Sequence, residues 1–297
     1  MLDFLDTHAR ASAQALLVVC RYLASQAKGQ DSDDLREALQ PGSLVRPTDL
    51  RSGMLGPALA VGKGLGFIES SEGKPPLWTL SKAVDRRTLE DSSDSTRAFY
   101  GSVLHTLGTR AVAAAESGDK VSDIALGFVW LAAQDPLEPI STNWGERAED
   151  SIIKAGLDSE INNGTQWIPF CRWATSLGLA VESSLSSRRS FLIPDCSGAI
   201  RRILPRLPRS LPAEQWLRQV YSALPVLGDP QLTKLVPGLP TRQASVISGS
   251  LALALHKLAR AGLIELIPSE DAVDAVLVRL GNQSKRVSKV RILEESA

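Results

Sequence analysis

The residues that enzymes most often use for acid–base or metal chemistry are scattered in this sequence. Its histidines, His8, His105 and His256, lie far apart, and none has a second potential ligand at helical or strand spacing. We interpret each as a surface or helix-cap residue and not as a metal ligand or general base. The glycine-rich run VGKGLG at 61–66 ends a predicted helix, whereas a phosphate-binding loop has to open one, so it is interpreted as a helix end.

Short catalytic motifs are absent, and the other reactive side chains have simpler explanations. The sequence contains no GxxxxGK[ST], GxSxG or HExxH pattern. The acidic runs at 31–34 and 269–274 could bind a cation, but helix capping explains the first and a solvated turn the second. The cysteines form no CxxC pair and lie among apolar neighbours, as reduced core thiols do (Cys20, Cys171 and Cys196). We therefore expect no catalytic residue, no metal site and no cofactor.

Basic residues are concentrated in two short stretches of the second half of the chain. Residues 183–209 contain six arginines and one acid, and residues 279–291 contain five basic residues and no acid. Such clusters can neutralise phosphates of a nucleic acid and give little sequence readout; the alternative is a solvated charged loop. The predicted nucleic-acid contacts, two of them on the last predicted helix, are Arg188, Arg189, Arg201, Arg202, Lys257, Arg260, Lys285, Arg286, Lys289 and Arg291.

The overall charge hides an asymmetry between the two halves of the chain. The 297 residues hold 33 basic and 33 acidic side chains, which argues against a protein that coats nucleic acid through its total charge. Residues 1–150 hold 15 basic and 21 acidic residues, whereas residues 151–297 hold 18 and 12. A neutral protein with a basic half can still bind a polyanion locally.

Composition and hydropathy indicate a cytoplasmic protein with more than one domain. The hydrophobic content of 43% can build real cores, and the length allows two or three modest domains. No stretch approaches the roughly 20 apolar residues of a membrane span. The first apolar run is short and follows Asp3 and Asp6, unlike a signal peptide.

A helix that ends on a glycine and continues into a strand occurs three times, at Gly66, Gly178 and Gly262. Two or three apolar residues follow each glycine, then a glutamate, a polar turn and a second extended run. Glycine adopts the left-handed conformation of a sharp helix end without steric penalty. One such corner could arise by chance, but each of these three follows predicted helices and precedes a predicted hairpin. This is the order of a winged helix-turn-helix unit.

The predicted fold is therefore mainly α with small β-hairpins (α+β), built of tandem winged helix-turn-helix units. The N-terminal winged-helix domain spans 1–85, and a charged, serine-rich linker follows it. A helical plus second winged-helix domain spans 96–205, and a C-terminal winged-helix domain spans 211–297. In the last domain LIELI and AVLVRL are expected to form the hairpin, with KVRIL as a third strand or a tail.

The predicted recognition helices carry few groups that could read bases. SGMLGPALAVGKG and WIPFCRWATSLG are poor in the Arg, Asn and Gln that bond to base edges, and the third helix is only somewhat richer. Trp167, Phe170 and Trp173 crowd the second of these helices. They are expected either to pack in a core or to form a protein-docking face, since base stacking would need more basic residues nearby than Arg172.

Two segments carry a resemblance to a known family. FCRWATSLGLAVES and FLIPDCSGAIRRIL, with the order of predicted wings, resemble the DpdG-type proteins of bacterial anti-phage defence islands, which accompany operons that handle deazapurine-modified DNA. The resemblance implies an accessory subunit that acts beside an ATPase, helicase or nuclease. It carries over no catalytic residue.

The leading hypothesis is a non-enzymatic adaptor or DNA-contacting subunit of a multi-protein complex, bound to the backbone of double-stranded DNA. The alternative is a winged-helix transcriptional regulator that binds DNA as a dimer. A third hypothesis is an enzyme whose active site has no recognisable motif.

Overall fold

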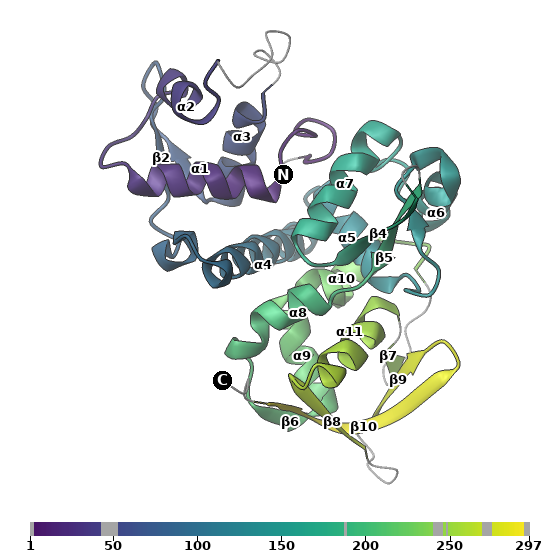
Figure 1. The fold of residues 1–297 in the computed structure, drawn as a ribbon. Helices are drawn as coiled ribbons and strands as arrows, with labels where there is room; N and C mark the ends of the chain where they lie inside the picture. The colour runs from purple at the N-terminus through teal and green to yellow at the C-terminus, as the bar shows by residue number, and fades with distance from the viewer. Residues whose placement is uncertain are drawn as a thin grey trace.

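The computed structural model describes residues 3–42, 53–186, 189–239, 246–247, 249–268 and 275–293. Within these ranges the chain forms eleven α-helices and ten strands (Figure 1). The helices are α1 (Ala13–Ser25), α2 (Ser32–Leu39), α3 (Leu55–Leu65), α4 (Ser93–Ser117), α5 (Asp123–Ala133), α6 (Glu149–Ala155), α7 (Gly164–Ser176), α8 (Ser197–Ile203), α9 (Ala213–Ala223), α10 (Pro230–Thr233) and α11 (Gly249–Arg260). The strands are β1 (Ile68–Ser70), β2 (Trp78–Leu80), β3 (Ile140–Ser141), β4 (Ala180–Ser186), β5 (Arg189–Pro194), β6 (Ser210–Pro212), β7 (Val246–Ile247), β8 (Ile264–Pro268), β9 (Val276–Leu280) and β10 (Gln283–Ile292). The chain is thus mixed α and β, as the sequence predicted.

The first part of the chain, from α1 to β2, has the expected order of three helices and a hairpin. The Ser12 hydroxyl caps α1 by accepting from the Ala15 N–H, and α1 buries Leu16, Cys20 and other residues of its apolar face. Strands β1 and β2 after α3 pair antiparallel in a two-stranded sheet. This arrangement buries one face of each helix and leaves the hairpin at the surface.

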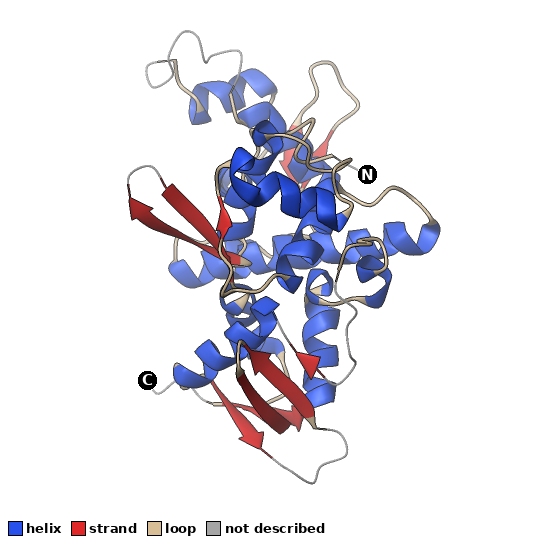
Figure 2. Cartoon of the chain, turned by 90° about the vertical axis from the view of Figure 1, so that its right-hand side faces the viewer, coloured by secondary structure: helices blue, strands red, loops and turns tan. Residues whose placement is uncertain are grey.

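The middle part of the chain, from α4 to α8, contains a strand that the sequence did not predict. Strand β3 lies between α5 and α6, and it pairs antiparallel with β5, so that the sheet order is β3-β5-β4. The β4–β5 hairpin follows α7 and projects from the surrounding helices (Figure 2). The order is therefore helix, strand, two helices and a two-stranded hairpin.

The last part of the chain, from β6 to β10, differs from the prediction in how its strands pair. The expected hairpin between LIELI and AVLVRL is wrong, because β8 pairs with β10, and β9 pairs with β10 and with β7. The first four residues of KVRIL are the end of β10, which also pairs with β6 and so joins the five-stranded sheet. A register shift between Val287 and Lys289 lets both Val287 and Val290 face the core. One long strand with a bulge thereby pairs with both strands of the expected hairpin.

The three glycine corners have the same local structure, which confirms that part of the sequence prediction. The φ angles of Gly66, Gly178 and Gly262 are 76°, 75° and 71°. In each corner the residue after the glycine donates its N–H to the carbonyl five residues back, with N···O distances of 2.8, 2.9 and 3.0 Å. Each corner leads into a strand with an antiparallel partner. A single helix-end motif is thus used three times.

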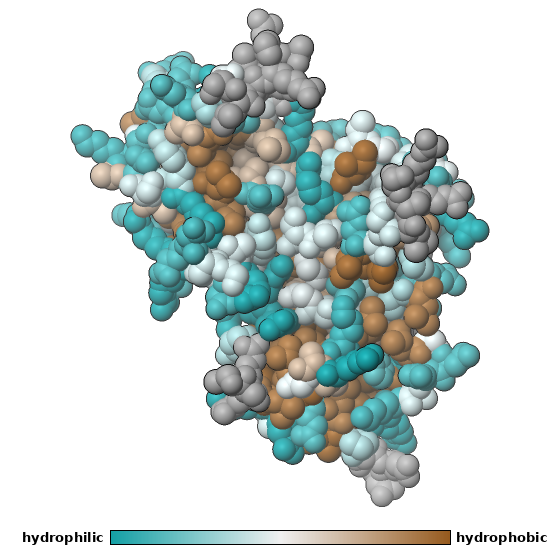
Figure 3. All heavy atoms as spheres, in the orientation of Figure 1, coloured by the Kyte–Doolittle hydropathy of each residue, from teal (hydrophilic) through white to brown (hydrophobic). Residues whose placement is uncertain are grey.

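Buried residues form one connected hydrophobic core through all three parts of the chain. Trp167, Phe170 and Trp173 of α7 are fully buried, and the Trp167 and Phe170 rings stack with centroids 5.2 Å apart. Core packing is therefore their role, and the docking-face alternative is wrong for these three residues. In Figure 3 hydrophobic surface gathers where α11 meets the C-terminal sheet.

Candidate nucleic-acid interface

The last two strands present basic side chains on the outer face of the C-terminal sheet. Val287 and Val290 of β10 are buried, so Arg286, Lys289 and Arg291 alternate with them and point to the opposite face. The bulge between the two valines keeps all three on that face. The exposed basic residues on this outer face are Arg279, Arg286, Lys289 and Arg291, and we call this set the basic strand face. Lys285 is also exposed, but it lies opposite the buried Val278 and so belongs to the other face of the sheet.

Strand pairing fixes the spacing of these charges. Arg286 lies opposite Leu277, and Arg279 lies opposite Ser284, so the two arginines are diagonal neighbours across the β9–β10 pair. Diagonal neighbours on one face are roughly 7–8 Å apart, so a single stretch of DNA backbone can contact both arginines. Arg291 pairs with Glu265 of β8 at 3.4 Å, and both side chains are about half exposed. An exposed pair of this kind is weak and can exchange its carboxylate for a phosphate.

The α11 helix is packed into the molecule instead of presenting a reading face. It lies against α8 and α5, and the buried Ser250 donates to the Ala132 carbonyl. Lys257 forms an ion pair with Asp195, a carboxylate that is only 3% exposed and that also accepts from the Ser197 N–H. Of the two basic residues predicted on this helix, Lys257 therefore has a structural partner, while Arg260 is exposed in the last turn.

The predicted contacts of the middle part fall in different surroundings. Arg188 lies outside the described residues, and Arg189 is the first residue of β5, opposite Ser186. Arg201 is exposed on α8. Arg202 is half-buried, donates to the Ser176 and Leu177 carbonyls, and lies 5.5 Å from the centre of the Tyr100 ring. Arg202 thus ties α8 to the end of α7 as well as carrying charge.

The exposed surfaces of α3 and α7 carry little that could read a base. On α7 the exposed side chains are Thr165, Ile168 and Thr175. Arg172 is half-buried and its guanidinium donates to the Ala9 and Ala11 carbonyls at 2.8 and 2.9 Å. On α3 the only exposed side chain with a charge is Lys63, which bonds to the Ser70 hydroxyl at 2.7 Å. The exposed surfaces of these two helices therefore have few side chains that could bond to base edges, as the sequence predicted.

The next side chains to consider are the cysteines and histidines, which are the potentially reactive groups. Burial raises the pKa of both the Cys20 and Cys171 thiols to about 12, which keeps them protonated and unreactive at neutral pH. His105 Nδ1 lies 2.8 Å from the Ala223 carbonyl, and burial lowers the pKa of His8. Across the described ranges no three His, Cys, Asp or Glu side chains lie close enough to share a metal ion. In the same part of the chain no helix has both the length and the apolar character to cross a membrane.

Comparison with known proteins gives one match. A family model described as DpdG-like matches residues 4–272, which is most of the chain. No curated protein matches the chain, and neither does any solved structure.

Proposed function

The chain belongs to the DpdG-like family, a component of Dpd defence systems, and on that premise we propose that it is a non-enzymatic adaptor subunit that contacts the DNA backbone. Its partners in this proposal are other proteins of the system, such as an ATPase, helicase or nuclease. The observation that carries the DNA contact is the basic strand face of β9 and β10. The proposed contact is independent of sequence, because phosphates are recognised by charge.

The arrangement of elements supports a winged-helix scaffold for this role. In the middle part the strand β3 precedes two helices, and it lies beside β5, the last strand of the hairpin. Helix, strand, two helices and a hairpin, with the first strand beside the last, is the topology of a winged helix-turn-helix. The first part supplies three helices and a hairpin in the same order. We propose that β4–β5 and the turn between β9 and β10 are the wings.

A dimeric transcriptional regulator is the less favoured alternative. Such a protein needs side chains that bond to base edges from an exposed helix. The exposed residues of α7 are two threonines and Ile168, and α11 lies against α8 and α5. These surfaces favour backbone contact over base reading.

The DNA contact is tested by salt-dependent binding of a short fluorescent duplex of random sequence. The variant replaces the four residues of the basic strand face by glutamine (Arg279, Arg286, Lys289 and Arg291). The control variant makes the same change in charge with exposed lysines elsewhere (Lys28, Lys82, Lys154 and Lys234). Four phosphate contacts correspond to a log–log salt slope of about −3.6, or about 150-fold in affinity between 50 and 200 mM salt.

The expected result is that the strand-face variant loses affinity and most of this slope on every DNA sequence tested, while the control variant keeps both. Equal loss in the two variants would show that only the net charge matters. No DNA binding by the parent protein at low salt would remove DNA from the proposal. A nuclease or nucleotide-hydrolysis turnover abolished by one substitution would contradict the non-enzymatic role.

A further inference from the structure

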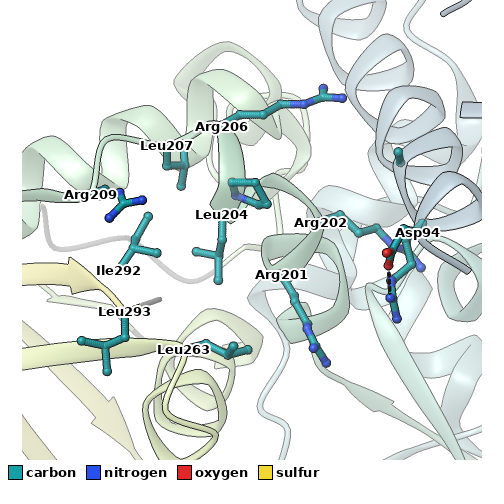
Figure 4. A pocket seen from close by; sticks show the side chains of 13 residues that line it. Asp94, Arg201, Arg202, Leu204, Arg206, Leu207, Arg209, Leu263, Ile292 and Leu293 are labelled. Carbon is teal, nitrogen blue, oxygen red and sulfur yellow. Dashed lines mark hydrogen bonds and ion pairs between the residues drawn. The ribbon is translucent and has the colours of Figure 1, made fainter. Parts of the chain in front are cut away.

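An open cleft of about 650 Å³ lies where the N-terminal turns of α4 meet α8 and the end of β10. It joins segments that are far apart in the sequence, because α4 contributes residues near 94–98 to one end, and Ile292 of β10 and Leu293 line the other end. Figure 4 shows the side chains around it. The charged residues that line it are Asp94, Arg97, Arg201, Arg202, Arg206 and Arg209. We call this hollow the arginine cleft.

One end of the arginine cleft holds positive charges close together. The burial of Arg202 lowers its pKa to about 10, and the nearby charge of Arg97 acts in the same direction, so the guanidinium stays charged at neutral pH under repulsion. Asp94 is the one carboxylate among the described lining residues, and it is already bonded to Arg97. The backbone bonds of Arg202 to Ser176 and Leu177 hold its guanidinium in place. Cations that are held close together in spite of their mutual repulsion attract an anion.

The other end of the arginine cleft is apolar. Leu204, Leu263, Ile292 and Leu293 converge there, with Arg209 beside Ile292 (Figure 4). Two backbone hydrogen bonds hold residues 292 and 293 in this wall. The Ile292 N–H donates to the Arg209 carbonyl at 2.7 Å, and the Leu293 N–H donates to the Leu263 carbonyl at 2.9 Å. An apolar wall of this kind suits a flat ring.

We propose that the arginine cleft binds a nucleoside phosphate, with the phosphates between Arg97, Arg201 and Arg202 and the base against the apolar end. The volume lies within the roughly 300–1,000 Å³ of small-molecule sites. Duplex DNA fits less well, because it presents phosphates on a convex surface and keeps its bases stacked inside, away from the apolar wall. This site goes beyond the proposed DNA contact and does not depend on it.

Titration calorimetry on the full chain tests the proposal with ADP, inorganic phosphate and adenosine as ligands. We expect ADP to bind most tightly, phosphate more weakly, and adenosine most weakly. Arg97→Gln and Arg201→Gln should each weaken ADP binding at least about tenfold, the usual loss for a charge-assisted hydrogen bond. Arg279→Gln, on the basic strand face, is the matched control and should leave ADP binding unchanged.

A further variant separates the two ends of the cleft. Leu293→Ser should weaken ADP but not inorganic phosphate, since only the base contacts this residue. Equal affinity for adenosine and ADP, unchanged binding by both arginine variants, or no heat with ADP would each overturn the proposal. Loss of duplex binding in the cleft variants without any mononucleotide binding would also overturn it and assign these arginines to a DNA surface. Far-UV circular dichroism confirms that each variant is folded.

Discussion

Replacing glycine by alanine at two equivalent corners should give two different losses of stability. Gly178 and Gly262 share the left-handed conformation and the same hydrogen bonds. An alanine in this conformation costs about 1–2 kcal/mol, and the smaller freedom of the unfolded chain returns about 0.4–1 kcal/mol. A Cβ at Gly262 would meet no atom within 4 Å. We therefore expect Gly262→Ala to lower the free energy of unfolding by about 0.5–1.5 kcal/mol.

At Gly178 the same Cβ would meet the backbone of α8. It would lie 2.8 Å from the Ala199 nitrogen and 2.9 Å from the Gly198 carbonyl carbon. These atoms cannot rotate away, because the Ala199 N–H is bonded to the Gly178 carbonyl at 2.9 Å. Overpacking of this kind costs about 1–3 kcal/mol, so Gly178→Ala should lose about 2–4 kcal/mol in total.

Urea unfolding followed by tryptophan fluorescence and circular dichroism measures both changes. Gly66→Ala is a third point, because its Cβ would meet only the movable end of the Arg110 side chain at 2.8 Å. It should therefore behave like Gly262→Ala. Losses at Gly178 and Gly262 that agree within about 0.5 kcal/mol would refute the reasoning, since they would show that contact with α8 carries no cost.

Two further predictions concern buried carboxylates. Burial raises the pKa of Asp123 to about 6, although the carboxylate accepts from the Phe4 and Leu5 N–H groups. The folded state binds this proton more tightly than the unfolded state, so the free energy of unfolding should fall by about 3 kcal/mol as the pH rises from about 2.5, below the unfolded pKa, to about 7, above the folded pKa. The midpoint of denaturant unfolding should depend less on pH in Asp123→Asn than in the parent protein. Equal pH dependence in the two proteins would contradict the raised pKa of Asp123. Lys257→Met leaves the buried Asp195 without its cation and should cost about 1–3 kcal/mol in urea unfolding. Adding Asp195→Asn should recover part of that loss, and a purely additive double variant would show that the pair is not coupled.

Helices and their ends were predictable from the sequence alone. The apolar face of α1 and the three glycine corners follow from the spacing of a few neighbouring residues. Helical periodicity and the left-handed conformation of glycine are local properties, so their signals survive without any knowledge of the rest of the chain.

Strand pairing was not predictable in the same way. LIELI and AVLVRL are both strands, as predicted, but each pairs with β10 and they do not pair with each other. The choice of partner depends on which edges compete for the same strand, and β10 is long enough to pair with three of them. Strand β3 is only two residues long and gave no alternating pattern.

The sequence by itself determined which charged residues exist, and the tertiary structure decided which of them meet. Lys257 was predicted as a DNA contact, yet the packing of α11 on α8 brings it to Asp195. Arg97 lies in the acidic half and was not predicted, yet α4 carries it to the arginine cleft beside Arg202. A charge cluster in a sequence records only composition along the chain. The partners of each charge depend on how helices distant in that chain pack together, because Coulomb interactions act through space.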